Sequence, residues 1–203
     1  MLDKNYDVLI VGGGIAGISC GLTLASTENK FGWSKERRYL IIDEGKSDLL
    51  QARLFNVPGV RQGADGEEVL LYMKKQLQKF QNIKFLEDKV LKISGSLSDF
   101  VIETKEGKVF KADRVVLATG MHKFDIEGLD IEIMTHDKVM KPGKIKIKNS
   151  DLKVKEGLYV AGLAAGSKTM FAIAAGDGTK VACDIFEEWT GKFAVAHDSV
   201  RAK

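Results

Sequence analysis

The sequence predicts an α/β fold: a Rossmann-like parallel sheet with helices and an inserted three-stranded antiparallel β-meander. Several short, uninterrupted apolar runs are typical of parallel strands that are buried on both faces. Helical patterns lie between these runs. From Lys89 to Ala112 the pattern changes, because apolar residues alternate with polar ones between turn segments, as in antiparallel strands. Together these observations indicate a parallel sheet that is interrupted by a meander.

Each predicted element follows from its own pattern. The buried parallel strands are the apolar runs at residues 6–11, 39–43, 83–87, 113–120 and 157–162. The meander strands are the alternating segments at residues 89–94, 100–104 and 108–112. The expected helices are a small-residue helix at 15–26, a helix at 65–80 that Asp65 can cap, and a closing helix at 169–190. Between them we expect a surface excursion at 27–38, a loop at 49–60 and a hairpin around 141–144.

Composition and charge are those of an ordinary globular protein, and they argue against nucleic-acid-binding, secreted and membrane-spanning proteins. The 203 residues are 44% hydrophobic and 29% charged, which allows one sizeable core and, we expect, one domain. The net charge of +3 is small, and the densest lysine group, at residues 141–155, alternates like a strand with a solvated face. We therefore expect no nucleic-acid partner. No signal-peptide pattern and no long apolar run occur, so we expect a cytoplasmic protein without membrane contact.

The cysteines and histidines do not predict thiol or metal chemistry. Cys20 and Cys183 lie in expected helices among small residues, far apart and outside any Cys-x-x-Cys pair. We interpret them as small apolar side chains rather than as a redox pair. The three histidines, His122, His136 and His197, lack the spacing of metal ligands, so no metal site is expected.

A glycine-rich corner predicts a dinucleotide site. Gly12, Gly14 and Gly17 form a G-x-G-x-x-G pattern between the first strand and the first helix. The first glycine permits the tight turn, the second lets the backbone approach a pyrophosphate, and the third lets the helix pack on the strand. Asp43, with Glu44 as the alternative, ends the second strand, where a carboxylate can accept hydrogen bonds from ribose hydroxyls. Because a carboxylate disfavours a 2′-phosphate, FAD or NAD(H) is favoured over NADP(H).

The glycine corner is followed along the chain by "NVPG" (56–59), the meander, "VVLATG" (115–120), "GLYVAG" (157–162) and "AIAAGDG" (172–178). This order of motifs resembles that of the thioredoxin reductase-like FAD-dependent oxidoreductases, within the two-dinucleotide-binding-domain flavoproteins. Family members carry an NAD(P)H domain inside the FAD domain, after the "ATG" element. Here only about forty residues separate Gly120 of that element from Gly162, too few for a domain of roughly 100 residues, and no second glycine motif or Cys-x-x-Cys occurs. We expect one FAD-binding domain over 1–203, with halves 1–120 and 155–190 joined by a connector at 121–154.

The resemblance implies a set of cofactor contacts. The glycine corner would line the pyrophosphate, Asp43 the ribose, the backbone of Val90 the adenine, and Asn56 with the start of the last helix the flavin. The implied cofactor-binding residues are Gly12, Gly14, Ile15, Ala16, Gly17, Asp43, Glu44, Asn56, Val90, Ala118, Thr119, Gly120, Gly162, Met170, Phe171 and Ala172. Leu163 departs from the pattern, because the family usually has an aspartate there, which holds the ribityl region. Losing that polar contact would weaken FAD binding or alter its pose.

We therefore expect a homodimeric FAD-binding oxidoreductase in which the flavin passes hydride or electrons between an external donor and an unidentified acceptor. A non-catalytic flavin- or NAD-binding module, such as a redox sensor or subunit, is the alternative. No catalytic residue is assigned: His122 could donate a proton but is favoured as a surface histidine, and Asp177 is favoured as an exposed helix residue. Gly176 and Gly178 could line the cofactor or serve close helix packing, and the sequence leaves both open.

Overall fold

The structure is a computed structural model that describes residues 3–197. Its main sheet has eight strands, with β11, β12, β8, β1, β2 and β5 side by side in that order, while β7 pairs with β8 and β6 with β7. The strands of this sheet are β1 (Asp3–Val11), β2 (Tyr39–Asp43), β5 (Ile83–Glu87), β6 (Val90–Ser94), β7 (Phe100–Thr104), β8 (Val109–Leu117), β11 (Lys153–Lys155) and β12 (Leu158–Val160). The predicted parallel sheet with an inserted meander is confirmed.

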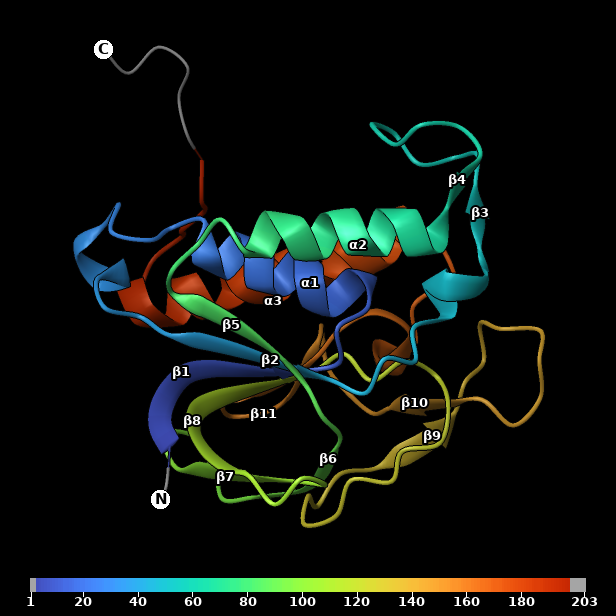
Figure 1. Cartoon of the computed structure of the whole chain (residues 1–203). Helices are drawn as coiled ribbons and strands as arrows, with labels where there is room; N and C mark the ends of the chain where they lie inside the picture. Colours follow the sequence, from blue (N-terminus) through green and yellow to red (C-terminus); the bar gives the residue numbers. More distant parts are fainter. Residues whose placement is uncertain (1–2, 198–203) are drawn as a thin grey trace, which may run out of the picture.

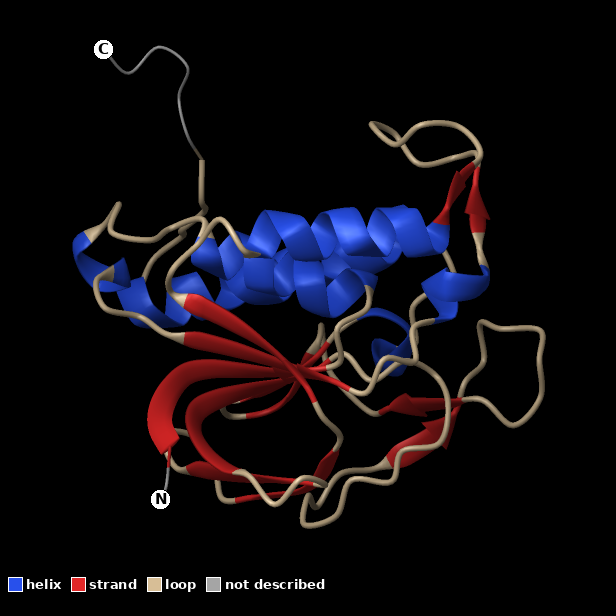
Figure 2. Cartoon of the chain, in the orientation of Figure 1, coloured by secondary structure: helices blue, strands red, loops and turns tan. Residues whose placement is uncertain are grey.

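Three α-helices lie together on one face of the sheet, and the meander lies beneath the other (Figure 1). The α-helices are α1 (Ile15–Ala25), α2 (Gly66–Leu77) and α3 (Phe171–Thr190), and the short 3-10 helices are η1 (Gly32–Ser34), η2 (Asp48–Gln51) and η3 (Gly162–Ala165). Two small hairpins complete the fold: β3 (Arg53–Leu54) with β4 (Ala64–Asp65), and β9 (Ile133–Thr135) with β10 (Ile145–Ile147). The predicted hairpin around 141–144 is the turn between β9 and β10, and the loop of each hairpin projects from the body of the protein (Figure 2).

The third meander strand and the fourth parallel strand are one continuous strand, which corrects the sequence-based prediction of two. The first half of β8 pairs antiparallel with β7, and its second half pairs in parallel with β12. β1 pairs in parallel with both halves. Burial along β8 changes accordingly, from alternating residues to the fully buried run at 115–117. The sequence pattern changes at this point because the pairing partner changes, although the strand itself continues.

Asp65 occupies the predicted N-cap position of α2, but its side chain does not cap the helix. Its carboxylate instead accepts a hydrogen bond from Arg53 Nε at 3.1 Å, across the β3–β4 hairpin. The predicted loop at 49–60 contains this hairpin's first strand together with part of η2. The Asp65 carboxylate therefore pairs with the Arg53 side chain instead of capping α2.

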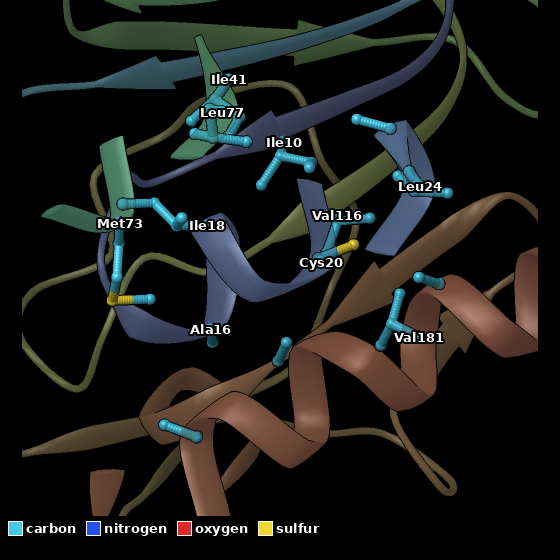
Figure 3. Packing of buried hydrophobic residues seen from close by; sticks show 14 of the residues in the cluster. Ile10, Ala16, Ile18, Cys20, Leu24, Ile41, Met73, Leu77, Val116 and Val181 are labelled. Atoms are coloured by element: carbon cyan, nitrogen blue, oxygen red, sulfur yellow. The ribbon is translucent and has the colours of Figure 1, made fainter. Parts of the chain in front are cut away.

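The core between the helices and the sheet is built around α1 (Figure 3). Ile10, Ile41 and Val116 extend from three neighbouring strands, and Met73 and Val181 come from α2 and α3. All five are buried. This packing fixes the start of α1 relative to the sheet, and so fixes the glycine corner that precedes it.

Gly178 allows α3 to cross α1 closely. A Cβ atom at this position would lie 2.0 Å from the carbonyl oxygen of Ala16 and 3.0 Å from the backbone nitrogen of Cys20. A Cβ at Gly176 would meet no atom within 4 Å. Of the two glycines that the sequence leaves open, Gly178 thus serves close helix packing, whereas Gly176 faces open space.

Glu188 near the end of α3 ties this helix to the edge of the sheet. Its carboxylate accepts hydrogen bonds at 3.0 Å from Arg114 of β8 and from Lys153 of β11. Partial burial raises the pKa of Glu188, but the neighbouring Tyr159 hydroxyl and the hydrogen bonds from Lys153 and Arg114 outweigh it, so the pKa lies below its usual value. A lowered carboxylate pKa means that the ionised group stabilises the fold above the unfolded-state pKa and that this contribution is lost as the pH falls.

We expect Glu188→Gln to lower the free energy of unfolding at neutral pH by about 1 kcal/mol, because the charge is partly solvent-screened. Urea unfolding at pH 7 and at successively lower pH measures this difference, which should shrink as the pH falls through the lowered pKa of the folded state, because the wild-type carboxylate then becomes protonated. Glu187→Gln is the matched control, since Glu187 forms no ion pair with a described residue. A pH-independent difference would contradict the assigned role.

The part of the chain that the structure describes contains neither a membrane-spanning helix nor a candidate metal site. Within residues 3–197, no helix has both the length and the apolar character that crossing a membrane would require. The same residues contain no cluster of three or more histidine, cysteine or acidic side chains that could bind a metal ion.

Candidate dinucleotide-binding site

A pocket of about 150 Å³ opens at the carboxyl ends of β1, β2, β8 and β12. Open parallel sheets bind their ligands at this edge. The pocket is lined by the glycine corner, the end of β2 with η2, the turn between β5 and β6, the segment after β8, and the start of η3. Segments from the two predicted halves and from the connector therefore meet here.

The glycine corner divides into glycines that the fold requires and one that faces the pocket. Gly12 has φ +107°, and a Cβ there would lie 2.3 Å from the carbonyl oxygen of Ala118. A Cβ at Gly17 would lie 1.9 Å from the carbonyl oxygen of Gly12, so Gly17 packs behind the corner. Gly14 lines the pocket, and its nearest neighbour to a built Cβ is Ser47 Oγ at 3.3 Å. Gly14 thus keeps the approach to the α1 N-terminus open, where free N–H groups favour an anion.

Asp43 supports the corner from within. Its side chain is buried, and Oδ1 accepts a hydrogen bond from the backbone N–H of Gly13 at 2.8 Å. Lys74 Nζ lies 3.8 Å from Oδ2. The role of Gly13 was not predicted: a Cβ there would lie 2.6 Å from the Phe85 ring and 2.7 Å from the Asp43 carboxyl carbon. Three consecutive glycines in the sequence are the signal that could have indicated it.

The turn between β5 and β6 forms one end of the pocket. Asp88 accepts hydrogen bonds from the backbone N–H groups of Lys89 and Glu106, at 2.7 and 3.3 Å. Burial raises the pKa of Asp88, but the Thr104 hydroxyl and these amides outweigh it, so the pKa lies below its usual value. Val90 follows directly and lines the pocket. A fixed carboxylate therefore holds the backbone turn that would meet an adenine.

The segment after β8 and the start of η3 form the opposite wall. Thr119 lines the pocket, and its buried Oγ1 has no hydrogen-bond partner among the described residues. Asp177 corrects the prediction of an exposed helix residue: it is partly buried and accepts hydrogen bonds from Gly162 N at 3.1 Å and Ser167 Oγ at 2.5 Å. Asp177 thus holds η3 in place beside Leu163, which lines the pocket. No pattern in the sequence indicates this long-range contact.

The predicted cofactor-binding residues divide into three groups. Those that line the pocket are Gly12, Gly14, Ile15, Ala16, Asp43, Glu44, Val90, Ala118, Thr119, Gly120 and Gly162. Gly17 packs behind the glycine corner. The four residues expected to meet the flavin, Asn56, Met170, Phe171 and Ala172, lie outside the pocket. Asn56 is exposed in the projecting β3–β4 loop (Figure 2), and Met170 and Ala172 are exposed at the start of α3.

His122 is a half-exposed surface residue, as predicted, but both of its ring nitrogens have partners. Nε2 lies 2.8 Å from Asp48 Oδ1, and Nδ1 lies 2.9 Å from Lys144 Nζ. His122 and Asp48 both line the pocket. The histidine therefore links segments on two sides of the pocket opening.

Comparison with known proteins identifies the family. Residues 6–170 match the family described as "Pyridine nucleotide-disulphide oxidoreductase". The chain belongs to this family. Among its curated relatives, thioredoxin reductase of Aquifex aeolicus is 29% identical over 118 residues, which are 58% of this chain and 35% of that protein. "Uncharacterized oxidoreductase CzcO" of Bacillus velezensis is 23% identical over 210 residues, covering 94% of this chain and 59% of that protein.

Solved structures of thioredoxin reductases share the fold of this chain. A thioredoxin reductase from Gloeobacter violaceus superposes with a TM-score of 0.74 at 17% identity, over 97% of this chain and 99% of that chain. Thioredoxin reductase from T. acidophilum gives a TM-score of 0.66 at 15% identity, over 92% of this chain and 99% of that chain. The predicted resemblance to thioredoxin reductase-like proteins is confirmed. The chain nevertheless spans only 35% and 59% of the length of the two curated relatives above.

Proposed function

We propose that the protein is an FAD-binding oxidoreductase that passes hydride or electrons between an external donor and a separate acceptor. One feature carries this proposal: the glycine corner opens into a pocket to which both halves of the chain contribute. Donor and acceptor are proposed as external because the 203 residues contain neither a second G-x-G-x-x-G motif nor a Cys-x-x-Cys pair. We also propose a cytoplasmic homodimer that binds no nucleic acid.

The residues of the pocket fit a dinucleotide. Gly14 leaves a space that a larger side chain would fill, and the amides at the start of α1 supply donors for a pyrophosphate. The buried Thr119 hydroxyl lacks a partner among the described residues, and Asp43 supplies a carboxylate at the end of β2. These residues would hold the pyrophosphate and the ribose, and Val90 would border the adenine. When bound, FAD supplies the redox chemistry, while the protein supplies binding and orientation.

The two cysteines do not offer a substitute for a cysteine relay. Burial raises the pKa of the Cys20 thiol far above its usual value. Burial also raises the pKa of Cys183. Because the thiolate is the reactive form, neither side chain is suited to exchange with a disulfide. The acceptor proposed for this protein therefore receives electrons from the cofactor directly.

A non-catalytic nucleotide-binding module, acting as a redox sensor or subunit, is the second candidate. Leu163 favours it, because this apolar residue lines the pocket where thioredoxin reductase-like proteins usually have an aspartate. Weak or altered binding of the ribityl region would suit a protein that senses the cofactor better than an enzyme that uses it in repeated catalytic cycles. The same observation keeps an NAD(H)-binding protein without flavin among the alternatives.

Visible absorption of the purified protein, after incubation with FAD and gel filtration, tests the proposal. We expect a yellow protein with about one FAD per chain, and we expect anaerobic NADH or NADPH, or a reduced partner protein, to bleach it. Bound FAD that no donor reduces would instead support the redox sensor or subunit. A colourless protein that binds NADH would support the NAD(H) alternative and contradict the flavin.

A further inference from the structure

The segment directly after the "ATG" element runs along the pocket opening. We refer to residues 122–126 as the pocket strap; all five of them line the pocket. Backbone hydrogen bonds fix the chain on both sides of it: Ile145 N donates to Met121 O, and Glu127 N donates to Leu91 O, both at 2.9 Å. Between these two points, no backbone hydrogen bond joins the strap to another described residue. The strap is therefore held over the pocket by its side chains.

The first side-chain bridge lies at the adenine end of the pocket. Lys89 Nζ donates to Asp125 Oδ2 at 2.5 Å, so the strap is joined to the turn between β5 and β6. Both side chains are partly exposed, at 27% and 39%. The hydrogen bond with Lys89 lowers the pKa of Asp125 below its usual value, which keeps the pair ionised at neutral pH.

The second bridge joins three segments through His122. Lys144, just before β10, has only N–H donors, so Nδ1 of His122 must accept its hydrogen bond. A neutral imidazole then carries its proton on Nε2, which donates to the Asp48 carboxylate of η2. Nε2 and Nδ1 face opposite partners, so a single ring spans the opening between η2 and the β9–β10 hairpin. Half of the His122 side chain is exposed, at 52%.

Both bridges are exposed charged contacts, which are individually weak and screened by salt. Phe124 and Ile126 of the strap are partly buried against the apolar cluster between the sheet and the meander. Because the strap is fixed at both ends and has no backbone ladder, its local opening is opposed only by the weak bridges and by the partial burial of Phe124 and Ile126. A lid over a cofactor pocket needs this property.

We propose that the pocket strap is a latch that opens to admit the dinucleotide and whose two bridges set the rate at which the dinucleotide leaves. His122 is the positioning residue of the latch, since it joins the strap to η2 and to the β9–β10 hairpin at once. This inference rests on the proposed FAD site for its ligand, but the latch itself is a property of the protein alone.

The latch is tested with His122→Ala, Asp125→Asn and the double variant, with His197→Ala and Lys141→Ala as matched controls outside the pocket lining. Stopped-flow fluorescence measures FAD release after dilution into an excess of a competing nucleotide. We expect each single variant to release FAD about 3-fold faster and the double variant about 10-fold faster. Wild-type release should also accelerate with salt, and that acceleration should be smaller in the double variant.

Hydrogen–deuterium exchange of the cofactor-free protein provides the second measurement. The amides of Glu127 and Ile145, whose hydrogen bonds to Leu91 O and Met121 O fix the two ends of the strap, should exchange faster in the bridge variants than in wild type, while those of β1 and β8 stay unchanged. Equal exchange of these two amides in all variants would overturn the latch, and so would unchanged FAD release with faster exchange. If wild type binds no FAD at all, the proposed function fails, and the exchange measurement alone still decides whether the strap is latched.

Discussion

Gly14→Val is expected to weaken FAD binding by about 100-fold or more while leaving the protein folded. The backbone of Gly14 is extended, with φ −82° and ψ −166°, which a valine adopts without strain. A Cβ there would meet only Ser47, at 3.3 Å or beyond. On the pocket side, however, the added methyl groups would keep a pyrophosphate away from the α1 amides. Losing two charge-assisted hydrogen bonds, at about 1.5–3 kcal/mol each, corresponds to this loss of affinity.

Titration of flavin fluorescence measures the affinity, and thermal unfolding of the cofactor-free protein measures the stability. Gly14→Ala should give an intermediate affinity, because its single methyl group fills less of the approach. Gly32→Ala is the control, since a Cβ at Gly32 would meet no atom within 4 Å and this residue lies outside the pocket lining. If Gly14→Val retains wild-type affinity, the pyrophosphate does not bind at this corner, and the FAD assignment fails with it.

The sequence predicts those parts of the fold and pocket that follow from local patterns. The apolar runs locate the parallel strands because residues buried on both faces of a sheet must be apolar whatever their partners are. The glycine corner is equally local, since Gly12 and Gly17 are required by contacts within one strand–turn–helix unit and the strand beside it. Asp43 belongs to the same class, because the end of β2 necessarily lies beside the end of β1.

The features that the sequence does not predict depend on residues far apart along the chain. Asp177 has the pattern of an ordinary helix residue, and only the packing of α3 brings its carboxylate to Gly162. The bridge from Lys144 through His122 to Asp48 joins three segments whose spacing carries no pattern. β8 shows a related effect, since its polar alternation ends where the β7 partner ends, and a change of partner resembles a strand boundary. Contacts between segments that are far apart along the chain, rather than local propensity, decide each of these features.

The second large effect is expected on stability, from alanine at Gly178. A new Cβ would lie 2.0 Å from the Ala16 carbonyl oxygen and 3.0 Å from the Cys20 nitrogen, both of which are backbone atoms of α1. Rotating a side chain cannot relieve this overlap, so α1 and α3 must move apart. We expect Gly178→Ala to lower the free energy of unfolding by about 3 kcal/mol, in the range of core overpacking. Because Ala16 also lines the pocket, FAD affinity should fall in the same variant.

Gly176→Ala is the matched control, because it makes the same chemical change two residues earlier on the same helix. A Cβ there meets no atom within 4 Å, so alanine only removes the helix penalty of glycine and should raise the free energy of unfolding by up to about 1 kcal/mol. Urea unfolding of the two variants beside wild type measures both changes. If the two variants change the free energy of unfolding in opposite directions, α3 must pack on α1 through Gly178 in particular. Two changes of the same sign would mean that helix propensity alone determines both, and that the close crossing which positions the start of α1 at the pocket does not exist in solution.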